Sequence, residues 1–212
     1  MKRLVKAILT VLLSIFPTPK HPQCLHDGLH LHWRLGWLRA RWCLLYYRLR
    51  AWFGGTTLIA GERFSVHGCL RLRGGGQVIF GDDVIIGAAT DIFTHDHAAT
   101  VRVGHRGFLN GARFSAVERI EIGDDAVVAD ARLMDTDFHS LSKRRQQREA
   151  PIGAAPIHIQ NNVWIAAGSA VLKGVKIGEN SVIAFGSVVV KDIPANVIAS
   201  GNPCRAISTV PE

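Results

Sequence analysis

Apolar residues recur every six positions through most of the chain. From residue 159, consecutive six-residue units begin with isoleucine or valine, at Ile159, Ile165, Val171, Ile177, Ile183 and Val189. The fifth residue of each unit is small or β-branched, and glycine, alanine, asparagine or aspartate fills most positions between. This period is typical of a parallel β-helix, in which each unit forms one short strand and one corner. We predict an all-β body in which three units close each triangular coil and the first residue of each unit points inward.

The same register continues upstream of this run. Further units begin at Phe80, Ile86, Val103, Leu109, Ile122, Val128 and Met134. Together they predict about six coils between residues 60 and 207. The register breaks at residues 95–102, where we expect a short loop, and at residues 140–158, which are polar and basic. Long loops in a regular fold seldom serve the scaffold, so the second break is expected to border a functional site.

Residues 1–55 follow a different pattern and are expected to form an α-helical extension to the body at residues 56–212. The apolar run at residues 4–16 would rise about 20 Å as a helix, which is short of the ~30 Å hydrocarbon core of a bilayer. It is followed by FPTPKHP and by no A-x-A site, so a cleaved signal peptide is not expected. Over residues 31–52, leucines and Trp42 recur at intervals of three and four, which predicts one apolar stripe on a helix.

The extension also carries the whole charge excess of the chain. Residues 1–52 contain nine Lys and Arg and a single acid, Asp27, whereas the remaining residues contain sixteen of each sign. An apolar stripe bordered by arginine and tryptophan suits a membrane interface, and packing on the body or on a neighbouring subunit is the alternative. The basic stripe does not continue into the body, which argues against a nucleic-acid partner. We expect a cytoplasmic protein that contacts the inner-membrane surface through residues 1–52.

Composition excludes several other classes of protein. The chain has 212 residues and is 48% hydrophobic and 20% charged, which is typical of a globular protein and not of a disordered one. Its four cysteines show no C-x-x-C spacing, which argues against a zinc ribbon or a disulfide scaffold and fits scattered thiols in the cytoplasm.

Short motifs near the C-terminus carry a resemblance to a known family. Residues 157–205 contain NNVWI, VVKDIP and a GNP turn followed by a basic residue, and residues 134–141 read MDTDFHSL. In these features the chain resembles the hexapeptide-repeat acyltransferases, above all sugar O-acetyltransferases of the maltose, galactoside and colanic-acid type. The resemblance covers roughly residues 66–207. It implies a left-handed parallel β-helix, a homotrimer with active sites between subunits, and acetyl-CoA or another acyl-CoA as the donor.

His139 is the candidate catalytic residue. By the resemblance, MDTDFHSL corresponds to the segment that carries the family's catalytic histidine. Neutral imidazole suits removal of a proton from an alcohol, because its pKa lies close to cellular pH. His139 ends its six-residue unit, so it is expected at a corner, where the alternative is an ordinary surface histidine. Because no serine or cysteine has an evident nucleophile setting, we predict direct transfer without an acyl-enzyme.

Two aspartates flank this histidine, and an asparagine lies upstream. Asp135 or Asp137 could orient the imidazole, or both could be solvated or corner-capping residues. The resemblance places Asn110, in FLNGARF, near the acyl or acceptor group.

A pair of histidines in the first break leaves two alternatives open. His95 and His97 are two residues apart and share one strand face, so they line the acceptor site or belong to the loop. With His105 or His139 they could instead form a three-histidine metal site like that of γ-class carbonic anhydrases. We expect no metal.

The donor site is expected from the resemblance at six positions. The WIAAG segment corresponds to the family's pantetheine channel, with Trp164 as a pocket wall and alanine where the family usually has glycine. Two cations correspond to positions that bind the nucleotide phosphates, for which ordinary solvated charges are the alternative. The cofactor-binding candidates are therefore Trp164, Ala166, Ala167, Gly168, Lys191 and Arg205.

These features together predict an acyl-CoA-dependent O-acyltransferase. Acetyl is the acyl group that we expect it to transfer. Its acceptor is expected to be a sugar hydroxyl of a polysaccharide or glycolipid precursor. The alternatives are an N-acetyltransferase acting on an amino sugar and a non-catalytic or metal-binding β-helix of the γ-carbonic-anhydrase kind.

Overall fold

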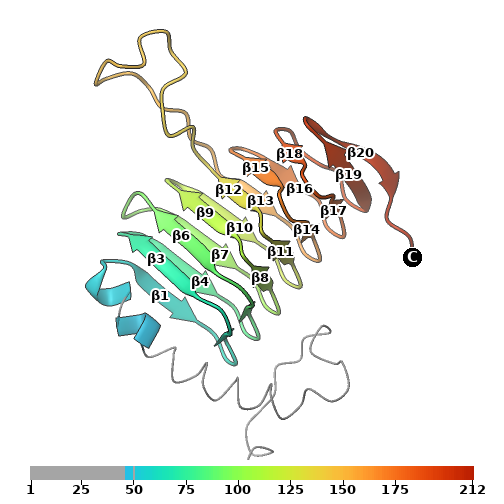
Figure 1. Ribbon diagram of the computed structural model, residues 1–212, viewed down its shortest axis with the longest axis horizontal. Helices are drawn as coiled ribbons and strands as arrows, with labels where there is room; N and C mark the ends of the chain where they lie inside the picture. The colour runs from blue at the N-terminus through green and yellow to red at the C-terminus, as the bar shows by residue number, and fades with distance from the viewer. Residues whose placement is uncertain (1–45, 50) are drawn as a thin grey trace, which may run out of the picture.

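The computed structural model describes residues 46–49 and 51–212, and its body is a parallel β-helix with three flat faces (Figure 1). Successive strands visit the three sheets in turn, so each sheet contains every third strand. All neighbouring strands run parallel except β19 and β20, which close the C-terminal end as an antiparallel pair. The predicted left-handed β-helix of triangular coils is confirmed, with six complete coils and a partial seventh.

We call the three sheets A, B and C in the order in which the chain enters them. Sheet A contains β1 (Thr57–Ala60), β4 (Gln77–Phe80), β7 (Thr100–Val103), β10 (Arg119–Ile122), β13 (Ile157–Ile159) and β16 (Lys176–Ile177). Sheet B contains β2 (Ser65–Val66), β5 (Ile85–Ile86), β8 (Phe108–Asn110), β11 (Val127–Ala129), β14 (Trp164–Ile165), β17 (Val182–Ile183), β19 (Val197–Gly201) and β20 (Cys204–Thr209). Sheet C contains β3 (Leu70–Gly74), β6 (Thr90–Thr94), β9 (Arg113–Ala116), β12 (Arg132–Met134), β15 (Ala170–Leu172) and β18 (Val188–Val189).

The six-residue period arises because one position in each unit fills the narrow interior. Ile165, Val171, Ile177, Ile183 and Val189 are all fully buried, as predicted for the first residue of each unit. Ser169, Ser181 and Ser187, at fifth positions, are also buried, and Ser181 and Ser187 donate hydrogen bonds to backbone carbonyls of Pro194 and Ala184. The interior is therefore a single stacked core, made mostly of small and branched side chains with a few phenylalanines such as Phe80 and Phe114.

Three columns of corners join the sheets, and we name them A–B, B–C and C–A. The A–B column contains residues with positive φ, which L-residues other than Asn and Asp seldom adopt. They lie one above the next along the helix and are Arg63, Asp83, Arg106, Asp125, Asn162, Asn180 and Asn196. Because each occupies the same left-handed corner, neighbouring side chains form hydrogen bonds, between Arg63 and Asp83, between Arg106 and Asp125, and from Asn162 through Asn180 to Asn196.

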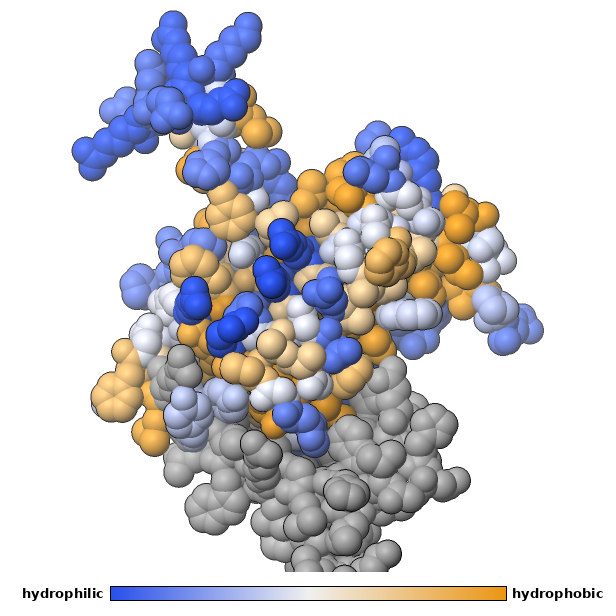
Figure 2. Space-filling view, in the orientation of Figure 1, coloured by the Kyte–Doolittle hydropathy of each residue, from blue (hydrophilic) through white to orange (hydrophobic). Residues whose placement is uncertain are grey.

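Both breaks in the period lie at the C–A column. The first loop covers residues 95–99 only, because Val101 and Val103 point inward and β7 already begins at Thr100, so the predicted loop was too long. The second leaves the body after β12 and returns at Ile157, so residues 157–158 belong to β13 and not to the loop. This long loop extends well away from the coils (Figure 1), and its surface is strongly hydrophilic (Figure 2).

Most of the predicted N-terminal extension lies outside the described residues. Residues 46–49 and 51–53 are helical, in agreement with the helix predicted over residues 31–52. The apolar run at residues 4–16 is not described, and the division of the chain at residue 55 stays a prediction. Within the described part of the chain, no helix is both long enough and apolar enough to cross a bilayer.

Candidate active site at the C–A corners

The C–A column brings together most of the residues predicted for catalysis. His95 and His97 follow β6, and Asp135, Asp137 and His139 follow β12 in the coil two turns along. Lys191 follows β18 in the same column. The remaining candidates lie elsewhere, with Trp164 on sheet B, Arg205 on β20, and a further group at the B–C column made up of Asn110, Ala166, Ala167 and Gly168.

His139 leaves the prism at a tight turn. Phe138 has a φ of 60°, and the backbone N–H of His139 donates to the carbonyl of Asp137 at 2.7 Å. The side chain of His139 is exposed, as expected for a corner residue at the start of a long loop. The turn therefore presents an imidazole to solvent at the edge of the body.

Asp135 has a structural setting of its own. Its side chain is fully buried, and its carboxylate accepts the backbone N–H groups of Val117, Glu118 and Arg119 at 2.8, 2.9 and 2.8 Å. These donors form the C–A corner of the preceding coil. The geometry matches the corner-capping alternative, and the carboxylate makes no hydrogen bond to His139 among the contacts of residues 51–212.

Asp137 fastens the base of the long loop. Its carboxylate accepts two hydrogen bonds from Lys173 Nζ, at 2.7 and 2.8 Å, and its backbone N–H donates to the carbonyl of Gly153 at 2.9 Å. Thr136 and Ala154 form an antiparallel bridge beside it. The loop thus has a closed neck that is anchored to the next coil. Lys173 was not predicted, because nothing in VLKGVK reveals a partner that lies across an insertion.

His95 lies against two aromatic rings. Its ring centroid is 3.8 Å from that of Phe93 and 5.0 Å from that of Phe138, the residue before His139. Removal of water by this packing lowers the pKa of His95, and the nearby charge of Asp135 opposes the shift. His97 points back to the coil below, where its Nδ1 lies 3.2 Å from the carbonyl oxygen of Gly75. Of the two histidines, His95 is therefore the one in contact with the residue before His139.

The B–C column carries a small-residue ledge. Ala166, Ala167 and Gly168 stack on the corner of the following coil, where the N–H of Gly186 donates to the carbonyl of Ala167 at 3.0 Å. Gly168 has a φ of 72°, a conformation that a side chain would strain. Phe185 lies beside Gly168 and is 78% exposed, so it forms an apolar wall next to the ledge. Its corner position in IAFGSV was the available signal, because the third residue of every other unit from 159 to 194 is polar or alanine.

The outer side of sheet B is apolar along its length. Phe108, Val127, Trp164, Val182 and Ile198 occupy register-matched positions on successive strands. Trp164 is half exposed in this row. Sheet B therefore presents a continuous apolar stripe at right angles to the strands.

The two cations expected at the donor site are exposed. Lys191 follows β18, and the neighbouring Asp192 accepts the backbone N–H of Lys176 at 2.8 Å. Arg205 lies opposite Ser200 in the closing hairpin. Neither cation forms an ion pair with any residue that the structure describes. Both remain available to an anionic ligand.

The histidines considered for a three-histidine metal site do not lie close together. His105 lies at the A–B column, where its Nδ1 accepts the backbone N–H of Asp82 at 3.1 Å, whereas His95 and His97 lie at the C–A column. Across residues 51–212, no three or more His, Cys, Asp or Glu side chains are grouped so that they could hold a metal ion.

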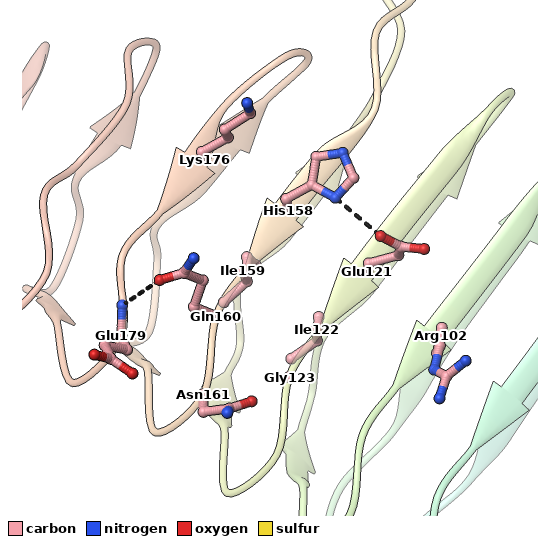
Figure 3. A pocket seen from close by; sticks show the side chains of 10 residues that line it. All are labelled: Arg102, Glu121, Ile122, Gly123, His158, Ile159, Gln160, Asn161, Lys176 and Glu179. Atoms are coloured by element: carbon pink, nitrogen blue, oxygen red, sulfur yellow. Dashed lines mark hydrogen bonds and ion pairs between the residues drawn. The ribbon is translucent and has the colours of Figure 1, made fainter.

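A charged hollow that sequence analysis did not predict lies on the outer side of sheet A. It has a volume of about 850 Å³, and Figure 3 shows His158, Glu121, Lys176 and Arg102 on neighbouring strands along it. His158 Nδ1 lies 2.9 Å from Glu121 Oε2, so the acid and the imidazole are already paired. The hollow is separate from the corner that carries His139.

Comparison with known proteins confirms the family resemblance. Residues 156–191 match the model of the bacterial transferase hexapeptide (six repeats). Galactoside O-acetyltransferase of Escherichia coli is 34% identical over 116 residues, which are 54% of this chain and 56% of that protein. Galactoside O-acetyltransferase of Lactococcus lactis is 44% identical over 85 residues, which are 40% and 41% of the two chains. The chain thus spans about half the length of these curated relatives, or less.

A solved structure extends the likeness to the fold. A hexapeptide-repeat-containing acetyltransferase of Vibrio cholerae, solved in complex with acetyl coenzyme A, has a TM-score of 0.56 and 23% identity to this chain. The match covers 80% of this chain and 78% of that one. The two proteins share the β-helix architecture.

Proposed function

We propose that the protein transfers an acyl group from an acyl-CoA to a hydroxyl of a sugar, with His139 as general base. The acyl group that we propose is acetyl. One observation carries the proposal: an exposed imidazole is held on a tight turn where a long loop leaves a hexapeptide-repeat body. Two relatives that match over residues of this body are named galactoside O-acetyltransferases, which supports a sugar acceptor.

The chain's own residues provide the base and the support for it. When bound, acetyl-CoA supplies an acyl group activated as a thioester. The neutral imidazole of His139 removes the proton of the attacking hydroxyl, which is too weak a nucleophile on its own. The Asp137–Lys173 pair holds the loop neck, and so the turn that carries His139, against the next coil. Backbone N–H groups at the corners stabilise the charge that develops on the acyl oxygen.

Two exposed cations and the B–C ledge fit the donor. Lys191 and Arg205 are free for the phosphate groups, and the Ala166–Gly168 corner lets a slender chain approach the backbone. Trp164 borders this surface from sheet B. Ala166 adds one methyl group to the channel.

The separation of the two corners supports a homotrimer. His139 lies at the C–A column and the ledge at the B–C column, which are different edges of one prism. A second copy would place its ledge beside the histidine of the first, so that each site forms between subunits. The apolar stripe on sheet B is the surface that we propose packs in this assembly.

The acceptor is proposed to be a precursor of a polysaccharide or glycolipid at the cytoplasmic face of the inner membrane. Residues 1–55 act as an appended anchor in this proposal, because residues 1–52 combine an apolar stripe with nine cations and one acid. The full chain is expected to float with phosphatidylglycerol vesicles, and a chain that begins at residue 53 is expected not to. Equal flotation of the two would contradict the anchoring role.

The replacement His139→Ala tests the catalytic proposal. Loss of the base is expected to lower the rate of thiol release at least ~100-fold while the affinity for coenzyme A, measured by calorimetry, is retained. His105→Ala, at the A–B column, is the matched control and should keep the parent rate. A His139→Ala protein with undiminished rate would rule out the assigned base.

A further inference from the structure

Arginines are concentrated on the outer side of sheet C, in its N-terminal half. Arg71 lies opposite Asp91, Asp91 lies opposite Arg113, and Arg113 lies opposite Arg132 in the parallel register. Arg73 points outward two residues beyond Arg71 on β3. Four exposed arginines on neighbouring strands thus surround one carboxylate.

That carboxylate cannot neutralise the group. The guanidinium of Arg71 holds Asp91 with two hydrogen bonds, one of them between Nη2 and Oδ2 at 2.8 Å. Arg71 lowers the pKa of Asp91, with smaller contributions from Arg113 and Arg73. Within the described chain, Arg73, Arg113 and Arg132 form no ion pair. About three positive charges therefore remain on this face.

The direct pairing of Arg113 with Arg132 is unfavourable for the fold. Like charges at facing positions of adjacent strands repel each other and destabilise a sheet. Asp91, which lies opposite Arg113, offsets only part of the positive charge on this face. An arrangement that costs stability, with too few acids on the described strands to balance it, points to an anionic partner outside these coils.

Three of these arginines line a hollow on the outer side of sheet C. Arg71, Arg73, Arg113 and Phe93 line this space, whose volume is about 420 Å³. From Phe93, ring contacts continue through His95 to Phe138, the residue before His139. The strand between Arg132 and the C–A corner at Asp135 spans about 10 Å, at ~3.3 Å for each residue.

We propose that this arginine face binds the phosphate or pyrophosphate group of the acceptor, and therefore that the acceptor is a sugar phosphate. The inference rests on the proposed acyl transfer to a sugar. The planar fork of arginine forms paired, charge-assisted hydrogen bonds with phosphate oxygens. A phosphate dianion neutralises more of the excess than a single carboxylate does. The sugar then extends over Phe93 toward the base. A nucleotide-linked, lipid-linked or free sugar phosphate offers the same group.

Matched pairs of acceptors test the face directly. The kcat/KM of acetyl transfer is compared for glucose and glucose 1-phosphate, and for N-acetylglucosamine and its 1-phosphate. The parent protein is expected to prefer the phosphorylated member by at least ~10-fold, and added salt should reduce that preference. The double variant Arg113→Gln/Arg132→Gln should bring the ratio close to one. Arg102→Gln, an exposed arginine on sheet A, is the matched control and should keep the parent ratio.

Binding measurements separate this inference from the proposed function. Calorimetry with glucose 1-phosphate and with inorganic pyrophosphate needs no catalysis. Binding to the parent that the double variant loses supports the arginine site, even where no acceptor is acylated and the proposed transferase activity fails. An equal preference in parent and variant overturns the inference. A double variant that loses binding to phosphatidylglycerol vesicles but still binds the sugar phosphate also overturns it, because the arginines would then contact a membrane surface. Should the double variant fail to fold, Arg113→Gln alone, which removes an arginine that lines the hollow, is expected to lower the preference by at least ~3-fold, from the loss of one phosphate contact.

Discussion

The A–B corners differ from strands β9 and β12 on the outer side of sheet C in the charges that they place next to each other. At the A–B column Arg63 meets Asp83 and Arg106 meets Asp125, each pair at 2.6 Å, and further along the column Asn162 donates to Asn180 at 3.0 Å. On sheet C, Arg113 meets Arg132. A β-helix places equivalent positions about 4.8 Å apart, so every charge has a close neighbour of some kind. Neighbours of opposite sign stabilise the stack. Neighbours of like sign destabilise it, so we expect them where a surface serves binding and not stability.

The buried carboxylate of Asp135 differs from both regions. Its charge is balanced by backbone N–H groups, and among the described residues it pairs with no cation. Asp135→Ala would leave three N–H groups of the preceding corner without their acceptor. We expect the free energy of unfolding to fall by about 3 kcal/mol or more, as measured by urea denaturation. Asp135→Asn keeps one acceptor oxygen and should lose less. A fall below about 1 kcal/mol for the alanine variant would show that water replaces the carboxylate at no cost.

Removing one arginine from each region sharpens the contrast by its sign. Arg106→Gln deletes a partly exposed ion pair and is expected to lower the free energy of unfolding by about 0.5 kcal/mol. Arg132→Gln relieves a like-charge pair and should raise it by a few tenths of a kcal/mol, or roughly 0.3. Paired urea titrations at low salt measure both changes, and high salt should shrink both. Changes of the same sign would mean that the two regions do not differ in charge compensation.

The smallest effect concerns the dependence of stability on pH. Packing against Phe93 and Phe138 lowers the pKa of His95 in the folded chain below the ~6.5 of an unfolded one. The unfolded chain then binds a proton more readily, so stability falls as the pH drops from above ~6.5 through the folded pKa. His95→Gln should remove this contribution and flatten the dependence of the urea midpoint between pH 8 and 5. If the urea midpoint of His95→Gln depends on pH as the parent's does, other groups cause the loss of stability at low pH.

The repeat made the fold predictable, because the residues that fill the narrow interior recur at fixed intervals along the chain. Positions such as Ile165 and Val189 could be placed from the sequence alone. The clustering of His95, His97 and His139 at one column also follows from the order of units. The pairing of Arg113 with Arg132 follows as well, because each arginine is the fifth residue of its unit, in the units that begin at Leu109 and Val128. The Asp137–Lys173 pair crosses the long insertion, whose path no period describes.

The closed neck of the long loop has a consequence for the evolution of the loop's length and sequence. Thr136 and Ala154 pair across the base, so the chain re-enters the coil at a place that does not depend on how far it has travelled outward. Residues beyond the neck can be lengthened, shortened or exchanged while the stacked core keeps its register. The sequence of the loop and the folding of the coils can then change independently in one polypeptide.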